Sequence, residues 1–155
     1  MELIEIKKKY LTIQKKYSLP AFDYLNQNFE IDKIDRETEC LARLIRKVIM
    51  EKIVNSISFL ELLMNPMNAP RMYMGYVRSL TQDDKKIIED IYSVLGNISL
   101  ASLNLEIDYS EKKEAEMINE ISSVWESIKP KFRKILTDMK KPNSTLAKKE
   151  KSYFG

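Results

Sequence analysis

The longest uninterrupted amphipathic stretch of the chain decides its fold, and over residues 35–64 it has the sequence DRETECLARLIRKVIMEKIVNSISFLELLM. Its apolar residues recur mostly at spacings of three and four, which is the period of one helix face. These residues are Leu41, Leu44, Ile45, Val48, Ile49, Ile53, Ile57, Leu60 and Met64. No glycine or proline interrupts the stretch. It therefore predicts a central helix about 45 Å long, against which the remaining segments pack.

The composition favours an all-α protein with one domain. At 155 residues and 44% hydrophobic content, the chain is long enough to bury one core, and its length requires no second domain. Three glycines and five prolines are few for a sheet protein, which needs turn residues every several positions. We therefore expect an antiparallel helical bundle of four main helices plus one short helix. The domain would cover residues 1–139, and residues 140–155 would form a basic, disordered tail.

Four further segments have the apolar spacing that predicts helices, and they span about 2–16, 20–29, 82–107 and 110–139. Two of them contain a residue that disfavours a helix. Pro130 removes a backbone hydrogen bond and should kink the last helix near Lys129. Gly96 lies between Ser93 and Ser99, and this group of small residues favours a close contact with a neighbouring helix over a break in the helix.

Capping residues mark where two of these helices should begin. Thr81 and Asp84 have the spacing of a capping box, in which each side chain bonds a free backbone amide of the other residue. Asp32 or Asp35 is placed to cap the central helix, since an aspartate side chain accepts hydrogen bonds from unpaired amides in the first turn. The sequence thus predicts helix starts near residues 82 and 35.

The residue types that are missing exclude the commonest catalytic machinery. The chain contains no histidine, which removes Ser-His and Cys-His catalysis and imidazole ligation of metals. Cys40 is the only cysteine, so neither an intrachain disulfide nor a thiolate cluster for zinc can form. We therefore expect a protein without enzymatic activity, cofactor or metal site. Any chemistry would depend on carboxylates, lysines, tyrosines or arginines.

Nothing in the hydropathy pattern indicates a membrane. No apolar run approaches the roughly 20 residues that a membrane-spanning helix requires. The N-terminus has Glu2 and Glu5 among its apolar residues, which is not the layout of a signal peptide. The sequence therefore predicts a soluble, cytoplasmic protein.

Charged residues on the central helix form a candidate polar cluster of Glu39, Arg43, Arg46 and Glu61. Glu39 and Arg43 are four residues apart and can pair on one helix face. Glu61 has apolar neighbours on both sides, and a partly buried carboxylate needs a partner. Its candidate partners, just beyond the helix, are Arg71 and Arg78. A structural ion pair is the favoured interpretation, and a catalytic or ligand-binding carboxylate is the alternative.

A group of methionines and tyrosines after the central helix is a candidate partner surface. Its residues are Met67, Arg71, Met72, Tyr73, Met74 and Tyr76. Methionine adapts to irregular surfaces, and tyrosine offers a large contact area with a hydroxyl group. The alternative, which we favour from its position in a connection between helices, is that this group covers one end of the bundle.

The C-terminal residues concentrate the positive charge of the chain. Residues 140–155 contain five lysines and one glutamate. Clustered lysines bind nucleic acids by releasing counterions, and aromatic side chains can stack on bases. The residues of this candidate nucleic-acid tail are Lys140, Lys141, Lys148, Lys149, Lys151, Tyr153 and Phe154. A tail that only aids solubility is the alternative.

The leading hypothesis from the sequence is a non-enzymatic helical module for protein–protein interaction, or a subunit of a larger assembly. It would act on a protein partner or by self-association. One alternative is a nucleic-acid-associated accessory protein that uses the lysine-rich tail. Another is a small-molecule binder or enzyme with an arginine–glutamate site between helices.

Overall fold

The computed structural model describes residues 3–34 and 39–140. Within these ranges the chain forms helices and no strand, which confirms the all-α prediction. The helices are α1 (Leu3–Tyr17), α2 (Phe22–Phe29), η1 (Ile31–Lys33), α3 (Leu41–Met64), η2 (Pro66–Asn68), α4 (Arg71–Arg78), α5 (Gln82–Ile107) and α6 (Glu111–Met139). None of the described helices is both long and apolar enough to cross a membrane.

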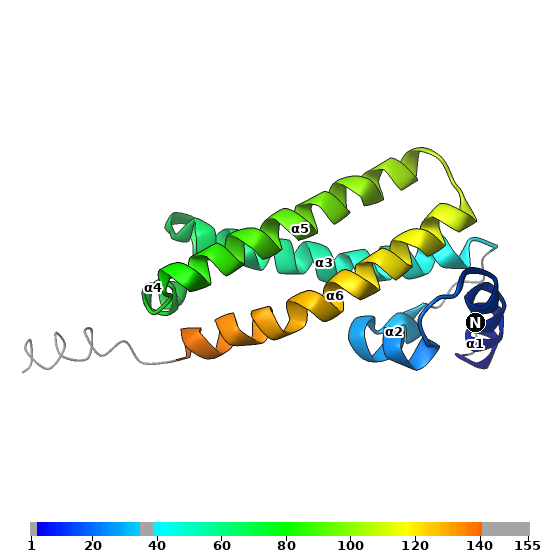
Figure 1. Cartoon of the computed structure of the whole chain (residues 1–155), viewed down its shortest axis with the longest axis horizontal. Coiled ribbons are helices and arrows are strands. Elements are labelled where there is room, and N and C mark those ends of the chain that lie inside the picture. The colour runs from blue at the N-terminus through cyan, green and yellow to red at the C-terminus, as the bar shows by residue number, and fades with distance from the viewer. Residues whose placement is uncertain (1–2, 35–38, 141–155) are drawn as a thin grey trace, which may run out of the picture.

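Three long helices, α3, α5 and α6, pack against one another (Figure 1). α3 and α6 run in the same direction, and α5 runs opposite to both. α1 and α2 lie at the end where α3 and α6 begin, and α4 lies at the other end. The predicted antiparallel bundle of four main helices is therefore not confirmed, because α1 covers an end of the three long helices.

The core lies where α3, α5 and α6 face one another. It consists mainly of isoleucine and leucine side chains at helical spacing. Buried examples are Ile45, Ile49, Ile53 and Leu60 of α3, Ile88, Ile91 and Leu95 of α5, and Ile118, Ile121 and Ile128 of α6. Each such side chain, when fully buried, contributes about 1.5–3 kcal/mol through the hydrophobic effect. Packing of these faces, more than helix propensity, therefore holds the long helices together.

The two N-terminal helices extend this core. Their buried side chains are Ile6, Tyr10 and Ile13 of α1, and Phe22, Leu25 and Phe29 of α2. Trp125 of α6 is buried beside them, with its ring centroid 5.6 Å from that of Phe29. A helix of eight residues is unstable in isolation, so α2 forms because its apolar face docks on this end of the core.

One predicted helix start is confirmed and the other is wrong. α5 begins after Thr81, whose side chain accepts a hydrogen bond from the Asp84 amide while Asp84 bonds the Thr81 amide. α3 begins at Leu41, and its N-cap residue Cys40 makes no side-chain capping bond. Asp32 lies in η1 and does not cap α3. Asp35 lies outside the described residues.

The two helix-disfavouring residues do not end their helices. α5 continues through Gly96, so the helix does not restart there. A Cβ atom placed on Gly96 would have nothing within 4 Å, so the predicted close contact with another helix of the chain is wrong. α6 continues through Pro130, which is exposed and lies inside the bounds of the helix.

Candidate functional site

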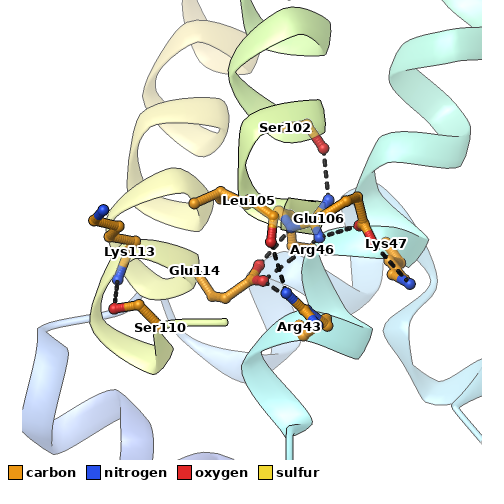
Figure 2. Close-up of polar contacts among 9 residues, drawn as sticks. All are labelled: Arg43, Arg46, Lys47, Ser102, Leu105, Glu106, Ser110, Lys113 and Glu114. Carbon is orange, nitrogen blue, oxygen red and sulfur yellow. Dashed lines mark hydrogen bonds and ion pairs between the residues drawn. The ribbon is translucent and has the colours of Figure 1, made fainter. Parts of the chain in front are cut away.

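Arg46 is the centre of a polar cluster, the Arg46 cluster, that joins α3, α5 and α6 (Figure 2). Its side chain is buried, and its Nε donates to the carboxylate of Glu114, which is also buried. Nη1 donates to the hydroxyl of Ser102 at 2.5 Å, and Nη2 donates to Glu106. Every guanidinium nitrogen of Arg46 therefore donates a hydrogen bond inside the chain.

Arg43, one turn before Arg46, completes the cluster from the same helix. Its Nε donates to Oε1 of Glu114 at 3.0 Å, and its Nη2 donates to the backbone oxygen of Leu105 at 2.6 Å. The guanidinium also lies 4.9 Å from the centroid of the Tyr109 ring, where a cation–π interaction is favourable. Glu114 is thus held by two arginines from α3.

The local structure of the connection between α5 and α6 places these carboxylates. Ser102 and Glu106 are four residues apart on α5, so they lie on the same side of that helix near its C-terminal end. Ser110 caps α6 by accepting from the Lys113 amide at 3.4 Å. Glu114 then lies in the first turn of α6, where the helix dipole favours a negative charge.

Hydrogen bonds favour the charged forms of Arg46 and Glu106. Burial alone would lower the pKa of Arg46, but its hydrogen bonds to Glu114 and Glu106 outweigh this effect and raise the pKa. The hydrogen bond from Arg46 lowers the pKa of Glu106, and a second one from Lys47 adds to this lowering despite partial burial. The ion pair between Arg46 and Glu106 therefore persists at neutral pH.

The polar atoms of the cluster are satisfied by one another. Among the described residues, no buried side-chain nitrogen or oxygen lacks a hydrogen-bond partner. The same residues contain no group of three or more histidine, cysteine, aspartate or glutamate side chains that could hold a metal ion. The geometry of the Arg46 cluster is therefore that of a structural connection between three helices.

The structure brings together only part of the predicted polar cluster. Arg43 and Arg46 meet at Glu114, whereas Glu39 lies before α3 and is exposed. Glu61 is fifteen positions beyond Arg46, about 22 Å along the helix. It is exposed and accepts a hydrogen bond from the Tyr92 hydroxyl at 2.9 Å, a partner that the sequence did not suggest.

Three members of the Arg46 cluster were missed by the sequence analysis. Ser102, Glu106 and Glu114 lie 56, 60 and 68 positions from Arg46 along the chain. No local pattern connects residues at such separations. The one available signal was the position of Glu114 in the first turn of a helix whose apolar face is otherwise regular.

The predicted methionine and tyrosine surface lies at the other end of the long helices. α4 contributes no fully buried residue. Met67, Met72 and Tyr76 are exposed, whereas Tyr73 and Met74 are half-buried. The rings of Tyr73 and Tyr76 contact edge to face, with centroids 6.4 Å apart. Arg71 is exposed at the start of α4.

The predicted nucleic-acid tail is described only at its first residue. Lys140 follows α6 as its C-cap residue and is exposed. The remaining tail residues, Lys141, Lys148, Lys149, Lys151, Tyr153 and Phe154, lie outside the described residues. The nucleic-acid hypothesis therefore stays a prediction from the sequence.

Two open pockets lie one after the other along α3, where it faces α5, and we call the two together the α3–α5 groove. Its first part has a volume of about 630 Å³ and lies between residues 46–55 of α3 and residues 99–106 of α5. Its second part, about 610 Å³, is lined by residues 58–68 and by Tyr92. The two parts follow one another along α3 from the Arg46 cluster to its C-terminal end.

Exposed apolar side chains border the groove. Leu103 of α5 and Val54 of α3 line its first part, and Met64 lines the second. On α5, Leu100 and Ile107 flank Leu103 at helical spacing. The exposed fractions are 64% for Leu100, 61% for Leu103 and 78% for Ile107. Contiguous exposed apolar residues are unusual on a monomer and mark interaction sites.

Comparison with known proteins gives no further guide to this site. No protein-family model matches the chain, and neither a curated protein nor a solved structure is significantly similar to it. The function must therefore be inferred from the geometry of the chain itself.

Proposed function

We propose that this protein is a non-enzymatic helical interaction module that binds an amphipathic helix of a protein partner in the α3–α5 groove. The observation that carries the proposal is the α5 stripe, which we define as Gly96, Leu100, Leu103 and Ile107. These residues recur at i, i+4, i+7 and i+11, the spacing of one helix face. The opposite face of α5 is buried in the core, so the stripe is a second apolar face that residues 3–34 and 39–140 leave exposed.

The shape of the groove suits a helix. Residues 46–64 of α3 line it, which corresponds to about 27 Å or five helical turns. Gly96 has open space where a side chain would project, so a partner helix can approach the α5 backbone closely there. Recognition of a helix in a groove depends on apolar anchors at this spacing.

The charges along the groove favour a basic partner. Arg46 and Lys47 both pair with Glu106, and Lys47 Nζ lies 3.2 Å from its carboxylate. Glu51 makes no ion pair with a described residue, and Glu61 is hydrogen-bonded by a neutral tyrosine. Two carboxylates on α3 therefore remain available to lysine or arginine side chains beside the apolar face of a partner helix.

The Arg46 cluster supports a binding role over a catalytic one. Catalysis needs groups that can interact with the reacting atoms, whereas the guanidinium nitrogens of Arg46 already donate to Glu114, Ser102 and Glu106. The cluster instead fixes the ends of α3 and α5, and so sets the width of the groove beside it.

A designed peptide tests the proposal. The probe is a helix of about 18 residues with leucines on one face, lysines on both sides of that face and a fluorescent label. We expect the full chain to bind it, and Leu103→Ser with Ile107→Ser to weaken binding about tenfold or more, because both apolar anchors lose their contacts. Fluorescence anisotropy measures the affinity, and circular dichroism verifies that the variant is folded.

Two controls make the result specific. Leu136→Ser changes an exposed leucine of α6 that does not line the groove, and it should leave the affinity unchanged. A probe with glutamates in place of lysines should bind at least about tenfold more weakly, because it meets Glu51 and Glu61 with like charge. Absence of binding, or equal loss in the Leu136 variant, would contradict the proposal.

A further inference from the structure

We propose that the helix bound in the α3–α5 groove is α1 of a second copy of this chain. This inference rests on the proposed function of the groove, and it names the occupant. The outer face of α1 suits the groove in spacing, charge and length.

The outer face of α1 is an exposed stripe of alternating apolar and basic residues. Ile4, Lys8, Leu11 and Lys15 lie at i, i+4, i+7 and i+11, and we call them the α1 stripe. Ile4 is 63% exposed and Leu11 is 48% exposed. The α1 stripe has the same spacing as the α5 stripe, so the two faces can pack against each other as rows of equal period.

The two lysines of the α1 stripe make no ion pair within the described part of the chain. Lys7 pairs with Asp23 at 3.3 Å, and Lys16 pairs with Glu111 at 2.9 Å. In contrast, neither Lys8 nor Lys15 makes an ion pair with a described residue. The α1 stripe therefore presents two positive charges beside its apolar residues. These charges are opposite in sign to the carboxylates of Glu51 and Glu61 in the groove.

The lysines of one surface complement the carboxylates of the other. Lys8 and Lys15 are about 10 Å apart along α1, and Glu51 and Glu61 are about 15 Å apart along α3. Lysine has a flexible four-carbon stem that can span this difference. α1 as a whole is about 22 Å long, which is shorter than the groove.

The occupant must come from another copy of the chain. Ile6, Tyr10 and Ile13 anchor α1 to its own core at the end of the long helices, so its outer face points away from that core. The α1 stripe and the groove are different surfaces, and such a contact is heterologous. Two copies can exchange the contact reciprocally in a closed pair, or many copies can continue it in an open chain.

Sedimentation velocity of the full chain over a range of concentrations tests the inference. We expect the wild-type chain to self-associate, and salt to weaken the association because the charges are at the surface. Lys8→Glu with Lys15→Glu should raise the dissociation constant about tenfold or more, since two attractive pairs become repulsive. Glu51→Lys with Glu61→Lys should do the same.

Mixing the two charge-reversed variants gives the decisive result. In an equimolar mixture each α1 stripe again meets a groove of opposite charge, so association should return to within about threefold of the wild-type dissociation constant. The matched controls are Lys131→Glu and the pair Glu116→Lys with Glu120→Lys, all at exposed positions of α6. These variants should associate as the wild-type chain does.

Several results would overturn the inference. A wild-type chain that remains monomeric, or association that neither charge reversal weakens, excludes α1 as the occupant. If that chain still binds the designed helix in the groove, the proposed function stands and only the identity of the occupant is wrong. If the chain is monomeric and binds phosphatidylserine vesicles, and if this binding requires Lys8 and Lys15, then the α1 stripe binds a membrane surface instead.

Discussion

The Arg46 cluster and the α3–α5 groove lie side by side, yet they are built in opposite ways. In the cluster, Arg46 and Glu114 are buried and satisfy each other inside the chain. At the groove, Leu103 lines the wall and its neighbours Leu100 and Ile107 flank it on α5, and all three side chains are exposed to solvent. A charged group that is saturated within its own chain contributes to structure. An ordered apolar face without a cover indicates a partner. Substitutions in the two regions test this contrast.

Removing the carboxylate of Glu114 should destabilise the fold strongly. In Glu114→Gln the positive charge of Arg46 stays buried but loses the negative charge of Glu114. Breaking a buried ion pair in this way costs about 3–5 kcal/mol of stability. Urea unfolding followed by circular dichroism measures the change. The control Glu116→Gln, at an exposed position of the same helix, should change the free energy of unfolding by less than about 0.5 kcal/mol.

A double replacement tests whether Arg46 and Glu114 stabilise the fold as a coupled pair. Arg46→Met combined with Glu114→Leu removes the two fully buried ions, while the half-buried Arg43 loses Glu114 but keeps its hydrogen bond to the Leu105 backbone oxygen. Its loss should be smaller than the sum of the two single losses, because the residues are coupled. If the losses simply add, Arg46 and Glu114 do not act as a unit.

Gly96→Ala should stabilise the monomer. The Cβ atom would meet nothing within 4 Å, and replacing glycine by alanine inside a helix gains about 0.5–1 kcal/mol. Thermal unfolding of the variant measures the gain. Gly96→Leu would fill the space that a partner helix needs, so it should weaken peptide binding without a loss of stability. A destabilised Gly96→Ala chain would show that the position is not open.

The smallest expected effect is the pH dependence that Glu106 contributes. Its hydrogen bond from Arg46 lowers its pKa in the folded chain. This contribution to stability is therefore present above the unfolded pKa and is lost as the pH falls through the folded pKa. In the Glu106→Gln variant, the free energy of unfolding should therefore depend less on pH below the ordinary pKa of a glutamate, which is about 4.3. The effect is modest because the side chain is 40% exposed. An unchanged acid profile would contradict it.

The sequence predicts helices well where a local pattern defines them. Thr81 and Asp84 sit at the start of α5, and the apolar period of α6 extends to Met139 as expected. The sequence predicts the structure poorly where contacts between distant residues determine it. The central helix ends at Met64 as predicted, but the residues after it form η2 and α4 instead of a simple connection.

The candidate site was predicted in part for the same reason. Arg43 and Arg46 were identified because they lie on one helix, whereas Glu114 belongs to another helix and is brought to them by tertiary packing. The small residues around Gly96 suggested a close contact with a neighbouring helix, and this prediction is wrong because a Cβ atom at Gly96 would meet nothing within 4 Å. Periodicity does not tell which neighbour covers a face, and the structure shows that no part of the described chain covers this one.

Trp125 provides an optical probe of the N-terminal end of the molecule. It is the only tryptophan of the chain, and its ring lies against Phe29 of α2, with Lys52 Nζ 5.3 Å from its centroid. Detachment of α2 would expose the indole to water and shift its fluorescence emission to longer wavelength. Since circular dichroism reports the helices of the whole chain, a difference between the two unfolding curves would reveal whether this end melts before the three long helices.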